Sequence, residues 1–554
     1  MKKKISAFLK EILKKEVADI KTEEIENRIE IPPSGDMGDF AFPCFFLSKK
    51  LRKNPNEIAE NIKNKLGKTP KFIDSVNVSG GYINFFLNKE LFAEETVKKI
   101  ISKKENFGKA NIGKGKKALI EHTSINPNAS PHVGRARNAI IGDSLVKILR
   151  FVNFKPEVHY YVNDISKQIA MLVLANAENL KFEQMLKRYV EISKKVSKSQ
   201  EMENKVFELL LRFESKEDKT VKKFKKITNT CVIGQKRILS EMGIHYDFFD
   251  YESKYISKSK KILEDLIKTG KVSKDKEGRF VLNLEGSGIE NKMKEPVLVL
   301  TRSDGTGLYL LRDIVYTLEK MEKSKTNIVV LGEEQKLYFD QLSYALKLLE
   351  KVPPRVVHYS FILLNSMGTS KKMSTRKGDI VLLEDFLNEA EKRAMKKSKN
   401  KKSAKEVSIA AVKYSILKNH PNKSINFSLE DSLNFEGNTG PYLLYTYARA
   451  NSILKKSKIK SKTFLSKNLD EKEFELVKIL NRFEETILNS YKELNPSIIA
   501  NYSYELAKIF NEFYHSTKVL GSEDEKFKLA MIDAFKITLK NSLYLLGINA
   551  IDRM

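Results

Sequence analysis

His132 lies in the stretch of the chain best suited to chemistry, residues 121–143, EHTSINPNASPHVGRARNAIIGD. An apolar run at 118–120 precedes it and predicts a short buried strand. After Pro131 the apolar residues recur at helical spacing. The expected order is strand, turn, helix, which directs backbone N–H groups and the positive end of the helix dipole at a ligand above the strand. Gly134 lets a ligand approach the backbone closely, and His132 places a polar donor there.

A second stretch suited to phosphate chemistry, KKMSTRKGD, occupies residues 371–379. A Lys-Met-Ser core among basic side chains suits a clamp on polyphosphate charge. Each stretch also has a plainer interpretation: a histidine that only caps a helix, and a lysine-rich loop that is only a solvated surface. The two together, in this order and about 240 residues apart, resemble the two signatures of class I aminoacyl-tRNA synthetases.

Four segments in combination resemble the arginyl-tRNA synthetase family: NPNASPHVGRARN, GLYLLRDIVY, MSTRKG and EGNTGPYLLYTYAR. The resemblance extends over nearly the whole chain, with the motifs in the family's order. It implies that ATP, with Mg²⁺, activates L-arginine to arginyl-adenylate, and that the arginyl group then moves to the 2′-hydroxyl at the 3′ end of tRNA(Arg). No covalent enzyme intermediate is needed, so positioning and charge stabilisation would provide the rate.

The resemblance also assigns roles to individual residues. ATP would be held by Pro131, His132, Val133, Gly134, Met373 and Ser374. The candidate catalytic cations are His132, Arg135, Lys372, Arg376 and Lys377, and we expect His132 and the basic run to face each other across the ATP. Arginine would be bound by Glu121, Asn126, Tyr309, Asp313 and Gln335, and tRNA by Tyr442, Tyr445, Arg449, Tyr514 and Met554. No metal-ligating side chains are expected.

The residues themselves support a pocket for a guanidinium group. Tyr309 and Asp313 lie four apart, on one face of a predicted helix. An Asp and a Gln (Gln335) that converge at sheet ends could hold a guanidinium through paired charge-assisted hydrogen bonds. The alternative for Asp313 is a surface carboxylate. For the tyrosines at 442–447, core packing is the alternative to stacking on bases.

Three positions depart from the family pattern. Arg135 replaces the second histidine of the HIGH-type signature, Ala129 replaces a lysine often found three residues before the first histidine, and Thr375 replaces the second lysine of KMSKS. Which cation stabilises the transition state therefore stays open among the basic candidates. We expect Arg135 to matter more for catalysis than its neighbour Arg137.

The departures keep two other functions in play. One is a tRNA-binding, synthetase-like protein with a degenerate active site, and the other is a synthetase of the same class for a different amino acid. Asp313, Tyr309 and Gln335, together with MSTRKG, argue against the first. The pairing of acidic with aromatic pocket residues argues against the second.

The elements that must position these residues predict a multidomain protein. Residues 1–112 predict a small α+β domain, with a helix capped by Asn56, which the resemblance places at the tRNA elbow. Residues 113–405 predict an α/β Rossmann-like class I catalytic domain with a parallel sheet. A helical region is inserted into this domain at about 177–290 and contains the aromatic segment 245–253. The sheet is expected to resume with a strand at 297–301. Residues 406–554 predict an all-α bundle, implied to bind the anticodon.

Composition limits the partners. The chain has 554 residues and 100 Lys+Arg against 71 Asp+Glu, a net charge of +29, which favours nucleic acid as a partner over a membrane. Its two cysteines, Cys44 and Cys231, support neither a disulfide framework nor a zinc site. The basic N-terminal helix is unlike a signal peptide and no apolar run approaches membrane-spanning length. We therefore expect a cytoplasmic protein, and a monomer.

Overall fold

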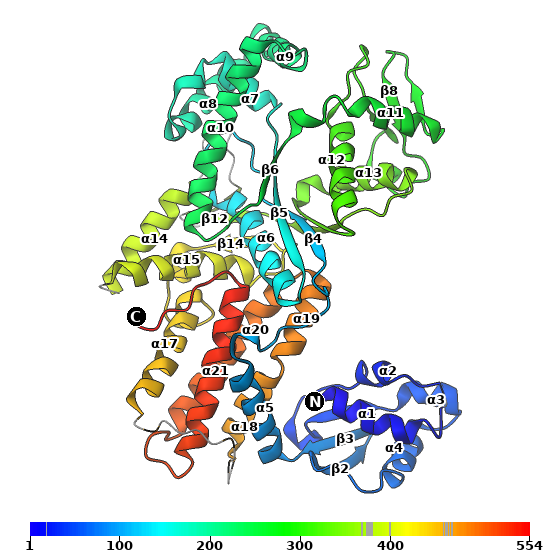
Figure 1. The fold of residues 1–554 in the computed structure, drawn as a ribbon, viewed down its shortest axis with the longest axis vertical. Coiled ribbons are helices and arrows are strands. Elements are labelled where there is room, and N and C mark those ends of the chain that lie inside the picture. The colour runs from blue at the N-terminus through cyan, green and yellow to red at the C-terminus, as the bar shows by residue number, and fades with distance from the viewer. Residues whose placement is uncertain are drawn as a thin grey trace. The chain divides into compact units, whose positions relative to one another are not determined.

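The fold is shown in Figure 1, a computed structural model. It describes the chain except residues 18, 367–368, 373–380, 398–399, 458, 460–463, 465 and 467–468, and except the side chains of 364–366, 369–372 and 397. The chain forms two compact units, and each is described by itself. The first consists of residues 1–103, 457–481 and 512–534, and the second of residues 104–456, 482–511 and 535–554.

The first unit begins with helices packed on a small antiparallel sheet of order β1-β3-β2, as predicted. Helix α1 buries Ile5, Leu9 and Leu13, whose spacing of four residues gives one apolar face. The α-helices and strands that lie wholly within the first unit are α1 (Lys2–Leu13), α2 (Thr22–Glu26), β1 (Phe40–Pro43), α3 (Phe45–Leu51), α4 (Pro55–Asn64), β2 (Ile73–Ser79), β3 (Tyr82–Leu87), α5 (Lys89–Lys103) and α18 (Glu471–Asn481).

The cap of helix α4 differs from the prediction. Asn54, not Asn56, is the N-cap residue, and its side chain accepts a hydrogen bond from the backbone N–H of Asn56 at 2.9 Å. Pro55 then occupies the first helical position, where its missing N–H has no cost. The Asn-Pro-Asn sequence allowed either asparagine, and the proline decides between them.

A five-stranded parallel sheet organises the second unit, in the order β11-β10-β4-β5-β6. The central strand β4 buries residues 118–121, consistent with a parallel sheet covered on both faces. The strands are β4 (Lys117–Glu121), β5 (Lys155–Val162), β6 (Phe248–Tyr251), β10 (Thr326–Gly332) and β11 (Arg355–Tyr359). The predicted parallel sheet is confirmed.

Two predictions about this sheet are wrong. Strand β6 lies inside the segment predicted as a helical insertion, and it pairs with β5 at the edge of the parallel sheet. Strand β9 (Val297–Val299), predicted to continue that sheet, instead pairs antiparallel with β8 (Phe280–Asn283), which pairs with β7 (Val272–Lys274). Short apolar runs indicate a strand but do not select its partner.

Helices lie around the sheet, and further helices form the part of the chain that connects β5 to β6 (Figure 1). Helix α6 (Val133–Phe151) connects β4 to β5, and α12 (Tyr309–Lys323) precedes β10. The others in this part are α7 (Lys167–Leu174), α8 (Phe182–Val196), α9 (Gln200–Glu214), α10 (Asp218–Glu241), α11 (Ser259–Lys268) and α13 (Lys336–Leu348). The predicted helical insertion at about 177–290 thus contains α8, α9, α10 and α11.

The region from residue 406 is mostly but not wholly helical. Strand β14 (Ile425–Phe427) pairs in parallel with β12 (Ile362–Ser366), which also pairs with β13 (Thr369–Lys372). The predicted boundary at 405/406 falls inside a helix, α15. The helices are α14 (Leu383–Lys397), α15 (Lys401–Leu417), α16 (Leu429–Ser432), α17 (Gly440–Lys456), α19 (Phe483–Glu493), α20 (Ser497–Ser516) and α21 (Glu525–Leu545).

No helix of the described residues combines the length and the apolar composition needed to cross a membrane. Nor do these residues contain a group of three or more His, Cys, Asp or Glu side chains arranged to hold a metal ion.

Candidate functional site

The turn between β4 and α6 has a strained backbone. Thr123 and Ser124 take positive φ angles of 81° and 40°, which is costly for residues with a Cβ and common at functional sites. The side chain of Asn138 on α6 stabilises the turn, because its Oδ1 accepts a hydrogen bond from the Thr123 N–H at 2.8 Å. His132 is the N-cap residue of α6, so the helix N-terminus opens beside it.

The chain that follows the second signature lies against the first. The Val133 N–H donates to the Val381 carbonyl at 3.1 Å, and the Leu383 N–H donates to the Pro131 carbonyl at 2.9 Å. His132 and Leu382 form an antiparallel bridge between these bonds. The backbone of Lys372 ends β13, but its side chain and the predicted residues Met373, Ser374, Arg376 and Lys377 lie outside the described part of the structure.

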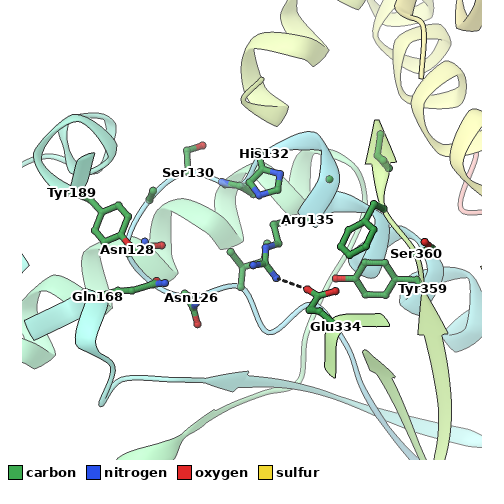
Figure 2. Close-up of a pocket in the computed structure, with 16 residues that line it drawn as sticks. Asn126, Asn128, Ser130, His132, Arg135, Gln168, Tyr189, Glu334, Tyr359 and Ser360 are labelled. Atoms are coloured by element: carbon green, nitrogen blue, oxygen red, sulfur yellow. Dashed lines mark ion pairs between the residues drawn. The ribbon is translucent and has the colours of Figure 1, made fainter. Parts of the chain in front are cut away.

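A cavity of about 400 Å³ lies at the N-terminus of α6 (Figure 2). Pro131, His132, Gly134 and Arg135 line it, as does Asn126, and Val133 is buried beside them. Its other lining residues include Asn128, Ser130, Gln168, Tyr189, Glu334, Tyr359, Ser360, Phe361 and Ile362. Three buried polar atoms at this cavity have no hydrogen-bond partner among the described residues: Ser130 Oγ, His132 Nδ1 and Gln168 Oε1. Such atoms are rare in folded proteins and indicate a place for a polar ligand.

The His132 side chain is a neutral group. Burial, with a smaller contribution from the Arg135 charge, lowers its pKa to about 4. At neutral pH the imidazole therefore offers one donor and one acceptor rather than a positive charge. The fixed charge beside it is Arg135, whose Nη1 lies 4.0 Å from Glu334 Oε1, the pair marked in Figure 2.

A second cavity, of about 360 Å³, adjoins the first and shares Asn126 and Glu334 with it. All five residues predicted to bind arginine line this cavity: Glu121, Asn126, Tyr309, Asp313 and Gln335. They come from the end of β4 and its turn, from the face of α12 that carries Tyr309 and Asp313, and from the short 3₁₀ helix η6 (Glu333–Gln335) after β10. The structure thus brings together residues more than 200 positions apart in sequence.

The electrostatics of the second cavity suit a cation. The Tyr338 hydroxyl donates a hydrogen bond to Asp313 Oδ2. Burial raises the pKa of Asp313 to about 6, although hydrogen bonds from Tyr338 and Tyr161 oppose the shift. An incoming cation would replace the solvation that the Asp313 carboxylate has lost.

Sequence reasoning missed Glu252, which lines the same cavity. Burial and the nearby Asp313 carboxylate raise the pKa of Glu252 to about 8, even though Arg312 Nη1 donates to its Oε1 at 3.0 Å. Glu252 lies in the segment 245–253, which the aromatic content favoured as core. Only the pairing of β6 with β5 brings it to the cavity.

A second residue that the sequence did not reveal is Lys320. Its ammonium donates to Glu121 Oε2, and it lies 4.0 Å from the centre of the Tyr316 ring. Both partners of this ion pair are at least nine-tenths buried. The ion pair therefore fixes the position of the Glu121 carboxylate at the edge of the cavity.

Three of the predicted tRNA-contacting residues form one cluster. Arg449 donates to Asn511 Oδ1 at 2.5 Å and lies 4.8 Å from the centre of the Tyr445 ring, and Asn511 donates to the Tyr442 hydroxyl at 2.8 Å. Tyr445 is 41% exposed, so an aromatic face backed by a cation is open to solvent. Tyr514, 37% exposed, belongs to the other compact unit, and Met554 is the partly exposed last residue.

Family models match three parts of the chain. Residues 1–87 match the arginyl tRNA synthetase N terminal domain, residues 96–427 match the catalytic domain of "tRNA synthetases class I (R)", and residues 443–554 match the DALR anticodon binding domain. The three models follow one another along the chain in the order of the predicted domains.

Whole-length relatives agree with these models. An arginine–tRNA ligase of Methanocaldococcus jannaschii is 36% identical over 581 aligned positions, covering 100% of both chains. One of Halothermothrix orenii is 34% identical and covers 99% of both. Among solved structures, Thermus thermophilus arginyl-tRNA synthetase matches with a TM-score of 0.83 and 26% identity, and covers 100% of both chains. A Plasmodium falciparum arginyl-tRNA synthetase, 21% identical with a TM-score of 0.79, shares the fold.

Proposed function

This chain belongs to the arginyl-tRNA synthetase family, and we propose that it uses ATP to attach L-arginine to the 3′ end of tRNA(Arg), releasing AMP and diphosphate. The observation that best supports this activity is the junction of the two cavities. The pocket of Asp313 meets the cavity at the N-terminus of α6 at Asn126 and Glu334. A guanidinium bound in one cavity and a polyphosphate in the other would bring a carboxylate to the α-phosphate.

In the arginine pocket, Asp313 pairs with the guanidinium while Tyr309 and Gln335 enclose it. Glu121 and Asn126 hold the amino-acid head, and the ion pair with Lys320 fixes the Glu121 carboxylate. A neutral amino acid of similar length leaves the buried Asp313 carboxylate without a cation. Discrimination by such unpaired buried groups is steep.

In the nucleotide cavity, Pro131, Val133 and Gly134 present the start of α6 to ATP, while His132 donates a hydrogen bond to a phosphate oxygen. Arg135 and the basic candidates Lys372, Arg376 and Lys377 stabilise the charge that develops on the α-phosphate and the leaving diphosphate. Met373 and Ser374 complete the ATP contacts from the second signature.

The fit of Mg²⁺ depends on ATP itself. Glu334 is the one carboxylate among the described residues that line the nucleotide cavity, so the phosphate oxygens would supply most of the ligands of the ion. When bound, Mg²⁺ neutralises phosphate charge in the transition state. Glu334 is then available either to the ion, through a water, or to Arg135.

For the tRNA, we propose that Tyr442, Tyr445 and Arg449, with Tyr514 and Met554, contact the anticodon side of tRNA(Arg), while residues 1–112 contact its elbow. The exposed ring of Tyr445 offers a face on which a base can stack. We further propose that the protein acts as a monomer in the cytoplasm. Size-exclusion chromatography with light scattering would test whether it is a monomer.

The experiment that tests this function is arginine-dependent ATP–pyrophosphate exchange, with and without tRNA, followed by charging of tRNA with arginine. Citrulline is the matched control, because it replaces the guanidinium by a neutral ureido group of the same size. We expect exchange and charging with arginine but neither with citrulline or lysine. Absence of both activities with every amino acid would favour a degenerate active site, and preference for another amino acid would contradict the specificity.

A further inference from the structure

Arg137 is the most fully buried cation of helix α6, with 0% of its surface exposed. Its Nη1 donates to the carbonyls of Ser360 at 2.8 Å and Phe361 at 3.3 Å. Its Nη2 donates to the carbonyls of His420 at 3.2 Å, Pro421 at 2.9 Å and Lys423 at 2.7 Å. One guanidinium therefore holds five carbonyl oxygens from two segments that lie about 60 residues apart in sequence.

The charge of Arg137 has an unusual environment. Among the residues that the structure describes, no carboxylate forms an ion pair with it, so carbonyl dipoles provide its compensation. Burial lowers its pKa to about 10, which still leaves it charged at neutral pH. A buried charge is costly, and an apolar side chain would fill the same space without that cost. The five carbonyl bonds are what this guanidinium adds.

The first segment that Arg137 holds is a wall of the nucleotide cavity. Residues 359–362, at the corner between β11 and β12, all line that cavity. Figure 2 shows Tyr359 and Ser360 at one end of it, and Gln168 and Tyr189 at the other. The second segment, the loop from α15 to β14, supports the wall directly, because the Ser360 N–H donates to the Pro421 carbonyl at 2.9 Å.

We propose that Arg137 positions the wall at residues 359–362 for binding ATP, as a positioning residue that does not touch the nucleotide itself. The inference rests on the proposed function, which places ATP in this cavity. Its physical basis is the fork of the guanidinium, whose planar donors reach two backbone segments at once. A lysine has three donors on one atom and cannot span both segments.

The test compares Arg137→Lys with Asp143→Asn in the full-length protein. Asp143 is a matched control on the same helix: it is buried and charged, and it binds Lys147 and Lys413, about 16 Å further along the helix axis than His132. For each protein, Michaelis constants for ATP and for arginine are measured in tRNA charging, together with the melting temperature.

We expect Arg137→Lys to raise the Michaelis constant for ATP at least fivefold while that for arginine changes less than twofold. Asp143→Asn should lower the melting temperature with both constants unchanged. The proposal would be overturned if Arg137→Lys left the Michaelis constant for ATP unchanged, or if both variants raised that constant equally. If the parent protein charges tRNA in none of these assays, the proposed function fails instead.

A second variant keeps the proposal testable if Arg137→Lys does not fold. Pro421→Gly leaves the buried charge in place and loosens the loop whose carbonyls Arg137 holds, through the added freedom of the glycine backbone. We expect a rise of about two- to threefold in the ATP constant alone. No rise in a folded Pro421→Gly protein would contradict the positioning of the wall by this loop.

Discussion

Among single residues, Asp313 is the one that we propose selects the amino acid. We predict that Asp313→Asn abolishes the use of arginine and leaves ATP binding nearly intact. A carboxylate that faces a guanidinium in a partly dry pocket forms two charge-assisted bonds, together worth roughly 3–5 kcal/mol. Exchange kinetics with varied arginine, and calorimetric titration with ATP, measure the two effects. If the Michaelis constant for arginine and the turnover number were both unchanged, a group other than Asp313 would bind the guanidinium of the substrate.

The two carboxyl groups of the arginine pocket lead to a second prediction, on pH. With pKa values raised to about 6 for Asp313 and about 8 for Glu252, the pair holds a proton near neutral pH. A bound guanidinium favours both ionised forms, so arginine binding should release a proton, and kcat/KM for arginine should fall as the pH drops from 8 to 6.

Calorimetry in buffers of different ionisation enthalpy measures this proton release directly. Glu252→Gln is the control, because it removes the group with the higher pKa and should reduce the release at pH 7. A binding enthalpy that does not depend on the buffer would contradict the prediction.

We propose different roles for His132 and Arg135 at the phosphates, His132 as a neutral hydrogen-bond donor and Arg135 as a positive charge. We predict that His132→Ala lowers turnover by about 10²-fold or more with a modest change in ATP affinity, the usual scale for one lost donor. His132→Asn, which keeps a neutral donor, should retain more activity. Pre-steady-state adenylate formation isolates this step, and an unimpaired His132→Ala protein would exclude the role.

Arg137→Ala is not a suitable control for Arg135→Ala. The sequence favoured Arg137→Ala as the milder neighbour, but Arg137 holds five carbonyls and its loss affects the structure. Glu334→Gln is the better control for Arg135→Ala, because it removes the ion-pair partner of the Arg135 side chain and leaves the Arg135 charge in place. We predict that Arg135→Ala slows adenylate formation at least tenfold and that Glu334→Gln slows it less than Arg135→Ala. Parent rates in Arg135→Ala would make Arg135 a bystander.

At the scale of elements, helix α6 must approach β4 closely for the turn to close. A Cβ on Gly142 would lie 2.2 Å from Cγ of the buried His122, next to the strained turn at Thr123. We predict that Gly142→Ala destabilises the fold by about 1–3 kcal/mol or more through overpacking. Chemical denaturation measures it, with Ser144→Ala, which loses one buried hydrogen bond to the Leu545 carbonyl, as the milder control. Equal stability of Gly142→Ala and the parent would show that His122 can move aside.

At the scale of the whole molecule, the catalytic and helical parts of the second unit share one core. Lys413 on α15 binds both Asp143 on α6, at 3.2 Å, and the Gly547 carbonyl, at 2.7 Å. Truncation after Lys405, at the predicted domain boundary, would cut α15 and remove Lys413, β14 and the carbonyls of the 420–423 loop that Arg137 holds. The carboxylate of Asp143 would lose a buried partner.

We therefore predict that the protein truncated after Lys405 is insoluble or unfolded, and that point substitutions test tRNA binding instead. Tyr445→Ala should weaken tRNA affinity by roughly 1–3 kcal/mol, the value of one stacked base, and leave ATP–pyrophosphate exchange unchanged. Tyr414→Phe, a buried tyrosine of α15 in the same helical region, is the control. A soluble truncated protein with normal exchange activity would contradict the shared core.

Local sequence patterns predicted the strand, the turn and the helix that carry the first signature. The buried run before residue 121, the turn at 122–132 and the helical pattern after Pro131 were all readable, because local turn and helix preferences act within a few residues. The five residues proposed to bind arginine were selected through a resemblance to a family, and all five line one cavity.

Which segments of the chain meet is seen in the folded structure and not in the local patterns. Strand β6 and Glu252 looked like part of an insertion until pairing with β5 brought them to the sheet edge and to Asp313. Lys320 and Arg137 were two among 100 basic residues until burial gave each a definite set of partners. Strand partners and buried charges depend on contacts between residues about 90 to 290 positions apart, and no local pattern contains the free energy that selects them.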